Sequence, residues 1–178
     1  MEYNLIATTD KITMSGASSQ LWMNLRAVGD PEPKVNKTHV KGIIQGTTTL
    51  DPVEAIVLMR EHMRSEIERY DKLYRVMPIL SWVNTGIDAI VAEVLAQKDR
   101  IGEDEKFRVT LEKRKTDLRS REVIEAVAEV IDNPVDLENP DWVVLVEIIG
   151  NHTGVSIVRD EALFNVQKER AAIIFSNQ

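Results

Sequence analysis

The sequence predicts an α/β (α+β) fold made of two small units, and two stretches carry that prediction. In residues 107–149, an alternating strand, an amphipathic helix and an unbroken apolar strand follow one another. In residues 3–80, the order is strand, helix, one or two strands, helix and strand, which is typical of a ferredoxin-like unit. The 178 residues allow two units of about 80 to 100 residues, each with a modest core.

The first half of the N-terminal unit, predicted over residues 1–80, has weak element signals. The apolar run at 3–8 predicts a strand, and the small polar residues at 9–17 predict a loop. A short helix follows, because apolar residues recur at helical spacing before Gly29. These apolar residues are Leu21, Trp22, Leu25 and Val28. Residues 40–49 predict a strand with a bend at its two glycines.

The second helix of this unit has a clear start signal. Asp51 is a suitable N-cap, Pro52 suits the first helical position, and Glu54 completes a capping box. Apolar residues at helical spacing extend this helix to about Tyr70. Residues 73–80 then predict a strand, which its proline ends or places at a sheet edge.

The second unit is predicted over residues 81–160. No Gly/Ser linker occurs at the boundary near 80–85, so we expect the two units to be packed together rather than tethered. The unit opens with a helix at about 86–98 and ends with a short return strand before residue 160. The tail at 161–178 is either helical or flexible.

The stretch between these ends carries the strongest pattern in the chain. Alternate residues from Phe107 to Leu111 are apolar, which predicts a half-buried strand. Ser120 is the predicted N-cap of the following helix, which ends before Pro134. Residues 142–146 are apolar without a break, so we expect a strand covered on both faces.

Charge is distributed unevenly over this same stretch. From Lys106 to Arg121 there are seven Lys and Arg residues against two acids, whereas from Glu122 to Glu161 there are ten acids and one base, Arg159. The net charge of the chain is −7, so the basic segment is a local exception. Clustered cations on one edge are typical of a phosphate-binding surface, although a solvated turn explains them too.

Six cations of this segment are therefore the predicted RNA contacts. The first choices are Lys113, Arg114 and Lys115; the surface is extended by Arg108, Arg119 and Arg121. Arginine suits bidentate contacts to phosphate, whereas lysine acts as a point charge. Main-chain N–H groups at the start of the helix add donors. No aromatic residue is interleaved with the cations, so we expect the RNA backbone and shape to be read rather than stacked bases.

The sequence contains no recognisable catalytic or metal-binding motif. It has no cysteine, and His39, His62 and His152 form no two-histidine helical motif. It also lacks a G-x-S-x-G elbow, a Walker loop and a G-x-G-x-x-G loop. We therefore expect no catalytic residue, cofactor or metal. The one unusual acid is Glu147 inside the apolar strand. A buried functional group is one interpretation of it, but we expect an open side of the sheet or a cation partner.

Several segments resemble a known family. The series FRVTLEKRKTDLRSREVIEAVAEVI, VDLENPDWVVLVEI and TGVSIV resembles a THUMP domain. The preceding segments DPVEAIVLMRE and RYDKLYRVMPI are similar to those before the THUMP domain in small proteins that assist tRNA N4-acetylcytidine formation. The resemblance covers roughly residues 48–158. It implies an N-terminal ferredoxin-like unit packed against a THUMP domain.

The resemblance also implies a function. It suggests docking on the tRNA acceptor stem and 3′ end, with a separate tRNA acetyltransferase bringing acetyl-CoA, ATP and the chemistry. THUMP domains are often fused to tRNA methyltransferases or 4-thiouridine synthases, for which 178 residues leave no room. We therefore expect a non-catalytic tRNA-binding adaptor. The alternatives are an RNA-binding subunit for tRNA methylation or thiolation, or a protein-binding scaffold that uses the acidic face at 122–161.

The N-terminal residues and the hydropathy of the chain bear on its location. The start of the chain lacks the basic residues and long apolar core of a signal peptide. No apolar run approaches the roughly 20 residues of a membrane helix. We therefore expect a cytoplasmic protein without a membrane partner.

Overall fold

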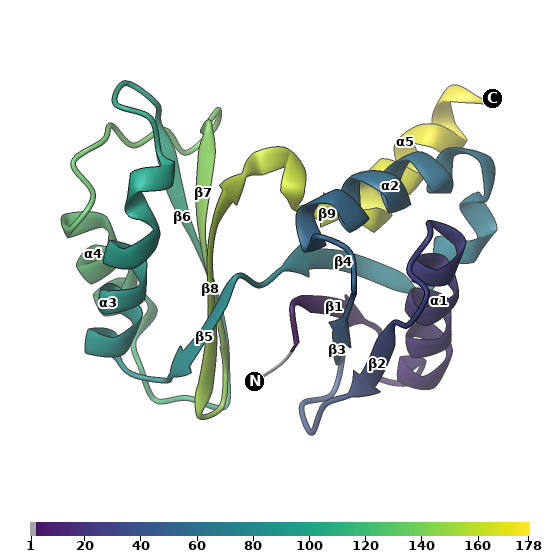
Figure 1. Cartoon of the computed structure of the whole chain (residues 1–178), viewed down its shortest axis with the longest axis horizontal. Helices are drawn as coiled ribbons and strands as arrows, with labels where there is room; N and C mark the ends of the chain where they lie inside the picture. The colour runs from purple at the N-terminus through teal and green to yellow at the C-terminus, as the bar shows by residue number, and fades with distance from the viewer. Residues whose placement is uncertain (1–2) are drawn as a thin grey trace. The chain divides into compact units, whose positions relative to one another are not determined.

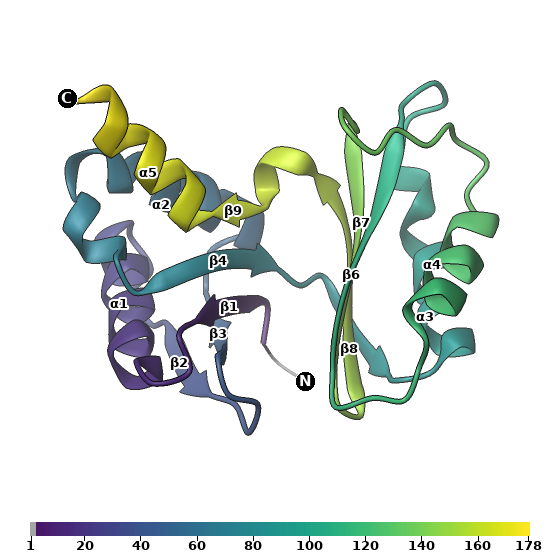
Figure 2. The same cartoon turned by 180° about the vertical axis from the view of Figure 1, so that it is seen from behind.

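The computed structural model of the protein describes residues 3–178, which form two compact units (Figures 1 and 2). Unit 1 contains the described residues up to Pro78 together with Glu161–Gln178, and unit 2 contains Ile79–Asp160. The C-terminal segment is thus part of unit 1, and most of it is helical.

Unit 1 is a five-stranded antiparallel sheet with helices packed on it. The strands are β1 (Leu5–Thr9), β2 (Lys34–Lys37), β3 (Ile43–Thr47), β4 (Leu73–Pro78) and β9 (Phe164–Asn165). Their order across the sheet is β2-β3-β1-β4-β9. The helices are α1 (Met14–Ala27), α2 (Pro52–Ser65) and α5 (Val166–Ser176), with a 3-10 helix at Ile67–Tyr70.

One apolar core joins the sheet and helices of unit 1. Alternate strand residues such as Leu5 and Ala7 face this core, because side chains of a strand alternate between its faces. Leu21 from α1, Met59 from α2 and Val166 from α5 complete it, and all are fully buried. The sheet with helices is the ferredoxin-like arrangement that the sequence predicts.

Local differences from the sequence prediction in unit 1 have physical reasons. The loop predicted over 9–17 is wrong in part, because α1 already begins at Met14 without a side-chain cap that would mark its start. Trp22, which the spacing predicts on the same helix face as Leu21 and Leu25, is 44% exposed whereas they are fully buried; its indole N–H donates to the carbonyl of Pro33 at 3.0 Å. The cap of α2 is confirmed, since the Asp51 carboxylate accepts the N–H groups of Val53 and Glu54.

A buried carboxylate ties two connections of unit 1 together. Asp30, which is 1% exposed, follows α1 and accepts hydrogen bonds from the hydroxyls of Thr48 (2.6 Å) and Thr49 (2.5 Å), which follow β3. Main-chain N–H groups of Glu32 and Thr49 also donate to it. Burial raises the pKa of Asp30, but these hydrogen bonds outweigh burial, and the pKa lies below its ordinary value.

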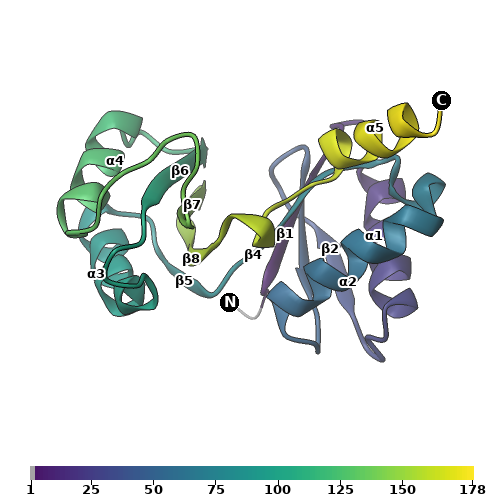
Figure 3. The same ribbon diagram turned by 90° about the horizontal axis from the view of Figure 1, so that it is seen from above.

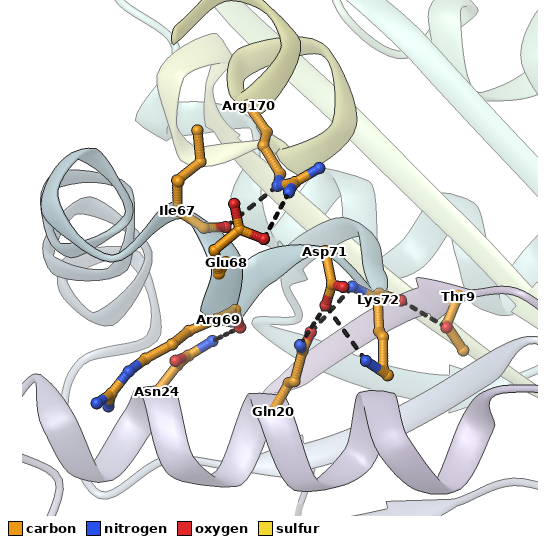
Figure 4. A network of polar contacts seen from close by, with 9 residues as sticks. All are labelled: Thr9, Gln20, Asn24, Ile67, Glu68, Arg69, Asp71, Lys72 and Arg170. Carbon is orange, nitrogen blue, oxygen red and sulfur yellow. Dashed lines mark hydrogen bonds and ion pairs between the residues drawn. The ribbon is translucent and has the colours of Figure 1, made fainter. Parts of the chain in front are cut away.

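The start of β4 is attached to α1 by side chains of that helix (Figure 4). Gln20 donates to the Asp71 carboxylate at 2.5 Å and accepts the N–H of Lys72 at 3.0 Å. Asn24, which is fully buried, donates to the carbonyl of Arg69 at 2.9 Å. The hydroxyl of Thr9 donates to the carbonyl of Lys72 at 2.6 Å, so the end of β1 is held beside the start of β4.

Unit 2 is a four-stranded mixed sheet with two helices on one face (Figures 1 and 3). The strands are β5 (Ser81–Asn84), β6 (Phe107–Arg114), β7 (Trp142–Ile149) and β8 (His152–Arg159), in the order β5-β8-β7-β6. The helices are α3 (Ile87–Gln97) and α4 (Ser120–Glu129), with 3-10 helices at Lys98–Arg100 and, at the border of the two units, Asp160–Ala162. Among the strands of unit 2, the pair β6 and β7 is parallel, whereas the pairs β5 with β8 and β7 with β8 are antiparallel.

The strands of unit 2 that have a long hydrophobic pattern agree with the sequence prediction. All eight residues of β7 are buried, as the unbroken apolar run predicts. The alternation of β6 is confirmed as well, because Phe107, Val109 and Leu111 contact the helical core. The predicted cap is wrong: Ser120 is the first residue of α4, and Arg119 occupies the N-cap position without a side-chain cap. None of the helices formed by residues 3–178 has the apolar length that a membrane-spanning segment requires.

The Asp30 network generates a pH-dependent prediction. A lowered pKa means that the stabilisation is present above the pKa of the unfolded chain, near 3.8, and is lost as the pH falls through the lower folded value. Asp30→Asn should lower the free energy of unfolding at neutral pH by about 1–3 kcal/mol. Its difference from wild type should shrink as the pH falls below about 4. Urea unfolding followed by circular dichroism measures this.

Glu32→Gln is the matched control, because the Glu32 side chain is exposed and only its main chain contacts Asp30. It should unfold as wild type does at each pH. A pH-independent difference between Asp30→Asn and wild type would contradict the role of the ionised carboxylate.

Candidate nucleic-acid interface

Three connections of unit 2 meet at the end of the sheet where β6 finishes. Arg114 is paired with Ile149, Ile149 with His152, and His152 with Asn84, so these strand ends lie side by side. The hydroxyl of Thr85 donates to the carbonyl of Gly150 at 2.7 Å, which joins the start of α3 to the turn between β7 and β8. Both helices of the unit therefore begin at this end, where helix N-termini favour anions.

The connection from β6 to α4 brings most of the predicted cations to this end. Lys115 has a φ of 58°, a left-handed conformation that turns the chain out of the sheet. The Lys113 ammonium donates to the carbonyl of Leu118 at 2.8 Å, which holds the connection closed. We call the exposed cations here the basic turn: Lys113, Lys115, Arg119 and Arg121.

The members of the basic turn differ in how they are engaged. Within residues 3–178, Lys115 and Arg119 have no hydrogen-bond or ion-pair partner for their side chains. Arg121 pairs with Glu125 at 2.7 Å, but its side chain is 89% exposed, and such a pair contributes little. Lys115 and Arg119 are therefore the cations most available to a phosphate.

Arg114 has a different environment from its neighbours. Its guanidinium forms an ion pair with Glu147, whose side chain is completely buried, while that of Arg114 is 19% exposed. The expectation of a cation partner for Glu147 is thus confirmed. Because the guanidinium compensates a buried carboxylate, the first task of Arg114 is structural.

Arg108 lies at the opposite end of β6 from the basic turn. Its guanidinium forms an ion pair with Asp160 at 3.3 Å and donates to the carbonyl of Leu137 at 3.3 Å. The structure therefore brings four of the six predicted cations together and places Arg108 and Arg114 in other contacts.

The sheet adds polar residues to the basic turn that the sequence analysis did not identify. Asn151 in the β7–β8 turn and His152 at the start of β8 are exposed, beside the end of β6. Both follow an apolar strand, and no sequence signal connects them with residues 113–121. Strand pairing alone makes them neighbours.

Acids at the opposite end of the unit 2 sheet hold loops in place. Glu105 accepts hydrogen bonds from the indole N–H of Trp142 and the N–H of Gly102, both at 2.9 Å, and pairs with Arg159. The hydrogen bond from Trp142, followed by that from Arg159, holds the pKa of Glu105 below its ordinary value. Asp136 accepts the N–H groups of Glu138 and Asn139, and its pKa is lowered for that reason. Of the acids at 122–161, Asp136 therefore has a local structural role.

The histidines show no arrangement for metal binding. In the part of the chain that the structure describes, no three His, Asp or Glu side chains are grouped as a metal site. The ring of His62 forms a hydrogen bond with the hydroxyl of Tyr70 at 2.9 Å. Burial raises the pKa of that tyrosine.

Comparison with known proteins identifies the domain that carries the basic turn. The THUMP domain family matches residues 87–158. The uncharacterized protein MJ0421 of Methanocaldococcus jannaschii is 33% identical over 127 residues, which is 67% of this chain and 35% of that protein. The chain therefore spans about a third of the length of this curated relative.

Solved structures share the fold at low sequence identity. PH1313 from Pyrococcus horikoshii has a TM-score of 0.64 at 18% identity, over 88% of this chain and 55% of that one. TrmN from Thermus thermophilus has a TM-score of 0.61 at 20% identity, over 86% of this chain and 44% of that one. A 4-thiouridine synthetase in complex with RNA and ATP has a TM-score of 0.51 at 15% identity, over 89% and 42%.

The ion pair between Arg114 and Glu147 generates a stability prediction. Arg114→Ala removes the cation from a buried carboxylate and should lower the free energy of unfolding by about 3 kcal/mol. Adding Glu147→Gln to this variant should restore part of the loss, because the buried charge is then absent. Lys115→Ala, one residue away and exposed, should change stability by less than about 0.5 kcal/mol. Urea unfolding of the four proteins measures these differences. Equal effects of the Arg114 and Lys115 variants would show that the ion pair has no structural role.

Proposed function

We propose that this chain, which contains a THUMP domain at residues 87–158 and is related to MJ0421 and PH1313, is a non-catalytic tRNA-binding adaptor. THUMP domains are RNA-binding modules of tRNA-modifying enzymes. The adaptor presents tRNA to a separate acetyltransferase that forms N4-acetylcytidine. The observation that carries the proposal is the basic turn, where exposed cations of the THUMP domain lie beside the N-termini of α3 and α4.

The composition of the basic turn favours contacts to the RNA backbone. A-form RNA hides its base edges in a narrow major groove, so proteins contact phosphates, 2′-hydroxyls and unpaired ends. Lys113, Lys115 and Arg119 supply positive charge for phosphates, while Asn151 and His152 add hydrogen-bonding groups at the same end. Trp142 is 8% exposed and lies under the guanidinium of Arg159, so its ring is covered. The acceptor stem and 3′ end of tRNA, which the family resemblance implies, offer a duplex backbone with an unpaired end.

The proposed contribution of the adaptor is to position the substrate. Holding tRNA near the acetyltransferase lowers the translational and rotational entropy that the reaction would otherwise lose. Acetyl-CoA, ATP and the acetyl transfer belong to that enzyme. The tests below distinguish two other outcomes. The partner enzyme could be one that methylates or thiolates tRNA, or the chain could be a scaffold that binds proteins through its acidic residues at 122–161.

Binding of tRNA at different salt concentrations tests the first half of the proposal. If about six phosphates are contacted, the affinity should fall by a factor on the order of 10³ between roughly 50 and 200 mM salt. The variant K113Q/K115Q/R119Q should bind more weakly, and its slope of log affinity against log salt should be smaller by about three. Arg114 is left unchanged because its loss would disturb the fold.

The matched control is R64Q/R75Q/K168Q, which removes the same charge from exposed positions on α2, β4 and α5. It should keep the slope of wild type. Salt-insensitive binding by wild type, or equal slopes for all three proteins, would contradict tRNA binding through the basic turn.

Nucleoside analysis of cellular tRNA tests the second half. Deleting the gene should abolish N4-acetylcytidine in tRNA, and wild type should restore it. K113Q/K115Q/R119Q should restore it poorly, whereas R64Q/R75Q/K168Q should restore it fully. Unchanged N4-acetylcytidine together with loss of a methylated or thiolated nucleoside would overturn the acetylation assignment and retain the adaptor role.

A further inference from the structure

One edge strand of the unit 2 sheet has no neighbour over most of its outer side. β6 is the last strand in the order β5-β8-β7-β6, and its outer edge faces the viewer in Figure 2. On this side the N–H of Phe107 donates to the carbonyl of Pro134 at 3.1 Å, and the carbonyl of Phe107 accepts the N–H of Asp136 at 3.0 Å. Val135 thus forms an isolated parallel bridge with Phe107 and covers only the first residue of the edge.

The main-chain groups of β6 beyond this bridge are free on the outer side. The carbonyl of Arg114 accepts the N–H of Gly150, which follows β7, at 2.9 Å. Even-numbered residues of β6 therefore bond to β7, and odd-numbered residues point outward, as Phe107 does. Within residues 3–178, the main-chain groups of Val109 and Leu111 have no hydrogen-bond partner on this side. Such an edge is a template for another strand.

The segment that covers the start of this edge is held in place but exposes two apolar side chains. The amide of Asn133 donates to the carbonyls of Gly102 and Glu105 at 2.7 and 3.1 Å. Val135 is 56% exposed and Leu137 is 70% exposed. Apolar side chains on a fixed main chain lose little conformational entropy when a partner covers them. We call the following four residues the docking edge: Val109, Leu111, Val135 and Leu137.

The docking edge lies in a region of negative charge. Residues 98–108, 129–141 and 159–160 meet at this end of the sheet and together carry ten acids and five Lys or Arg residues. Three of the five cations are held in ion pairs, and the other two donate to main-chain carbonyls. Asp132 and Glu138 are exposed and form no ion pair in the part of the chain that the structure describes. The excess of five negative charges repels phosphates and attracts basic side chains.

A second copy of this chain fits the docking edge poorly. Two β6 strands could pair antiparallel about a twofold axis, but a centre before residue 111 needs the place beside Phe107 that Val135 holds. A centre at residue 111 puts Arg108 opposite Arg114 of the second copy, and a centre at residue 112 puts two Glu112 side chains opposite each other. Like charges directly opposite each other destabilise a strand pair. The free edge therefore suits a strand of a different sequence.

We propose that the docking edge binds an extended segment of another protein, which pairs with β6 through main-chain hydrogen bonds. Its apolar side chains cover Val135 and Leu137, and its basic side chains lie near Asp132 and Glu138. Main-chain pairing gives such a complex affinity, and the side chains give it specificity. The inference rests on the proposed function, under which this protein is the acetyltransferase. The docking edge begins at the end of β6 opposite to the basic turn, so the enzyme and the tRNA occupy different residues.

The test is binding of the purified tRNA acetyltransferase of the same organism to the full chain, measured by isothermal titration calorimetry. V135Q/L137Q removes the exposed apolar contacts and should lower the affinity by about 10- to 100-fold. D132N/E138Q should bind more weakly than wild type and show a smaller dependence on salt. The matched control V57Q/L95Q removes apolar side chains that are 49% and 44% exposed on α2 and α3, and it should bind as wild type does.

Amide hydrogen exchange, followed by nuclear magnetic resonance, tests the strand pairing itself. In the free chain the N–H groups of Val109 and Leu111 should exchange faster than those of Thr110 and Glu112, which bond to β7. In the complex with the acetyltransferase, exchange at Val109 and Leu111 should slow by about tenfold or more. V135Q/L137Q should keep the tRNA binding of wild type, because the basic turn is unchanged.

Failure of this inference and failure of the proposed function give different results. Wild type that does not bind the acetyltransferase, binding that V135Q/L137Q leaves unchanged, or unprotected amides at Val109 and Leu111 would each overturn the inference. The salt dependence of tRNA binding and the cellular level of N4-acetylcytidine test the proposed function separately. Loss of tRNA binding by V135Q/L137Q would also overturn the inference, because the surface would then contact RNA. So would a wild-type dimer in sedimentation that V135Q/L137Q dissociates, because a second copy would then occupy the edge.

Discussion

The parallel pairing of β6 with β7 is the constraint on which the proposed site depends. Two parallel strands require a crossover, so α4 must begin where β6 ends and return along the sheet to the start of β7. This places the cations of residues 113–121 and the N-terminus of α4 at the same end. The antiparallel turn between β7 and β8 adds Asn151 and His152 there. The direction of the strands is thus what brings the residues of the site together.

The cations of residues 108–121 differ in their contacts: some are held in ion pairs, and others are exposed without one. Arg114 faces Glu147 on the fully buried strand β7, and Arg108 faces Asp160 at the other end of β6. Lys115 and Arg119 lie in the connection between strand and helix, and within residues 3–178 neither forms an ion pair, although Asp117 lies between them in the sequence. A count of cations along the sequence therefore overstates the number available to a ligand.

Much of the fold can be predicted from the sequence where a hydrophobic pattern is long or where a helix start carries capping residues. Asp51 with Pro52 marks the start of α2, the alternation from Phe107 marks β6, and the apolar run after Asp141 marks β7. The sequence does not predict β2 and β5, because each has four residues and is too short to show a clear period. The basic turn is predictable because its four cations lie within residues 113–121 of the sequence.

The most direct measurement of the central claim is ultraviolet cross-linking of the full chain to tRNA, with the linked peptides identified by mass spectrometry. Binding of tRNA through the basic turn predicts cross-links in peptides that contain residues 113–121 and 150–152. Cross-links confined to the acidic stretch at 122–141 or to α5, or no cross-links under conditions in which tRNA is bound, would contradict it.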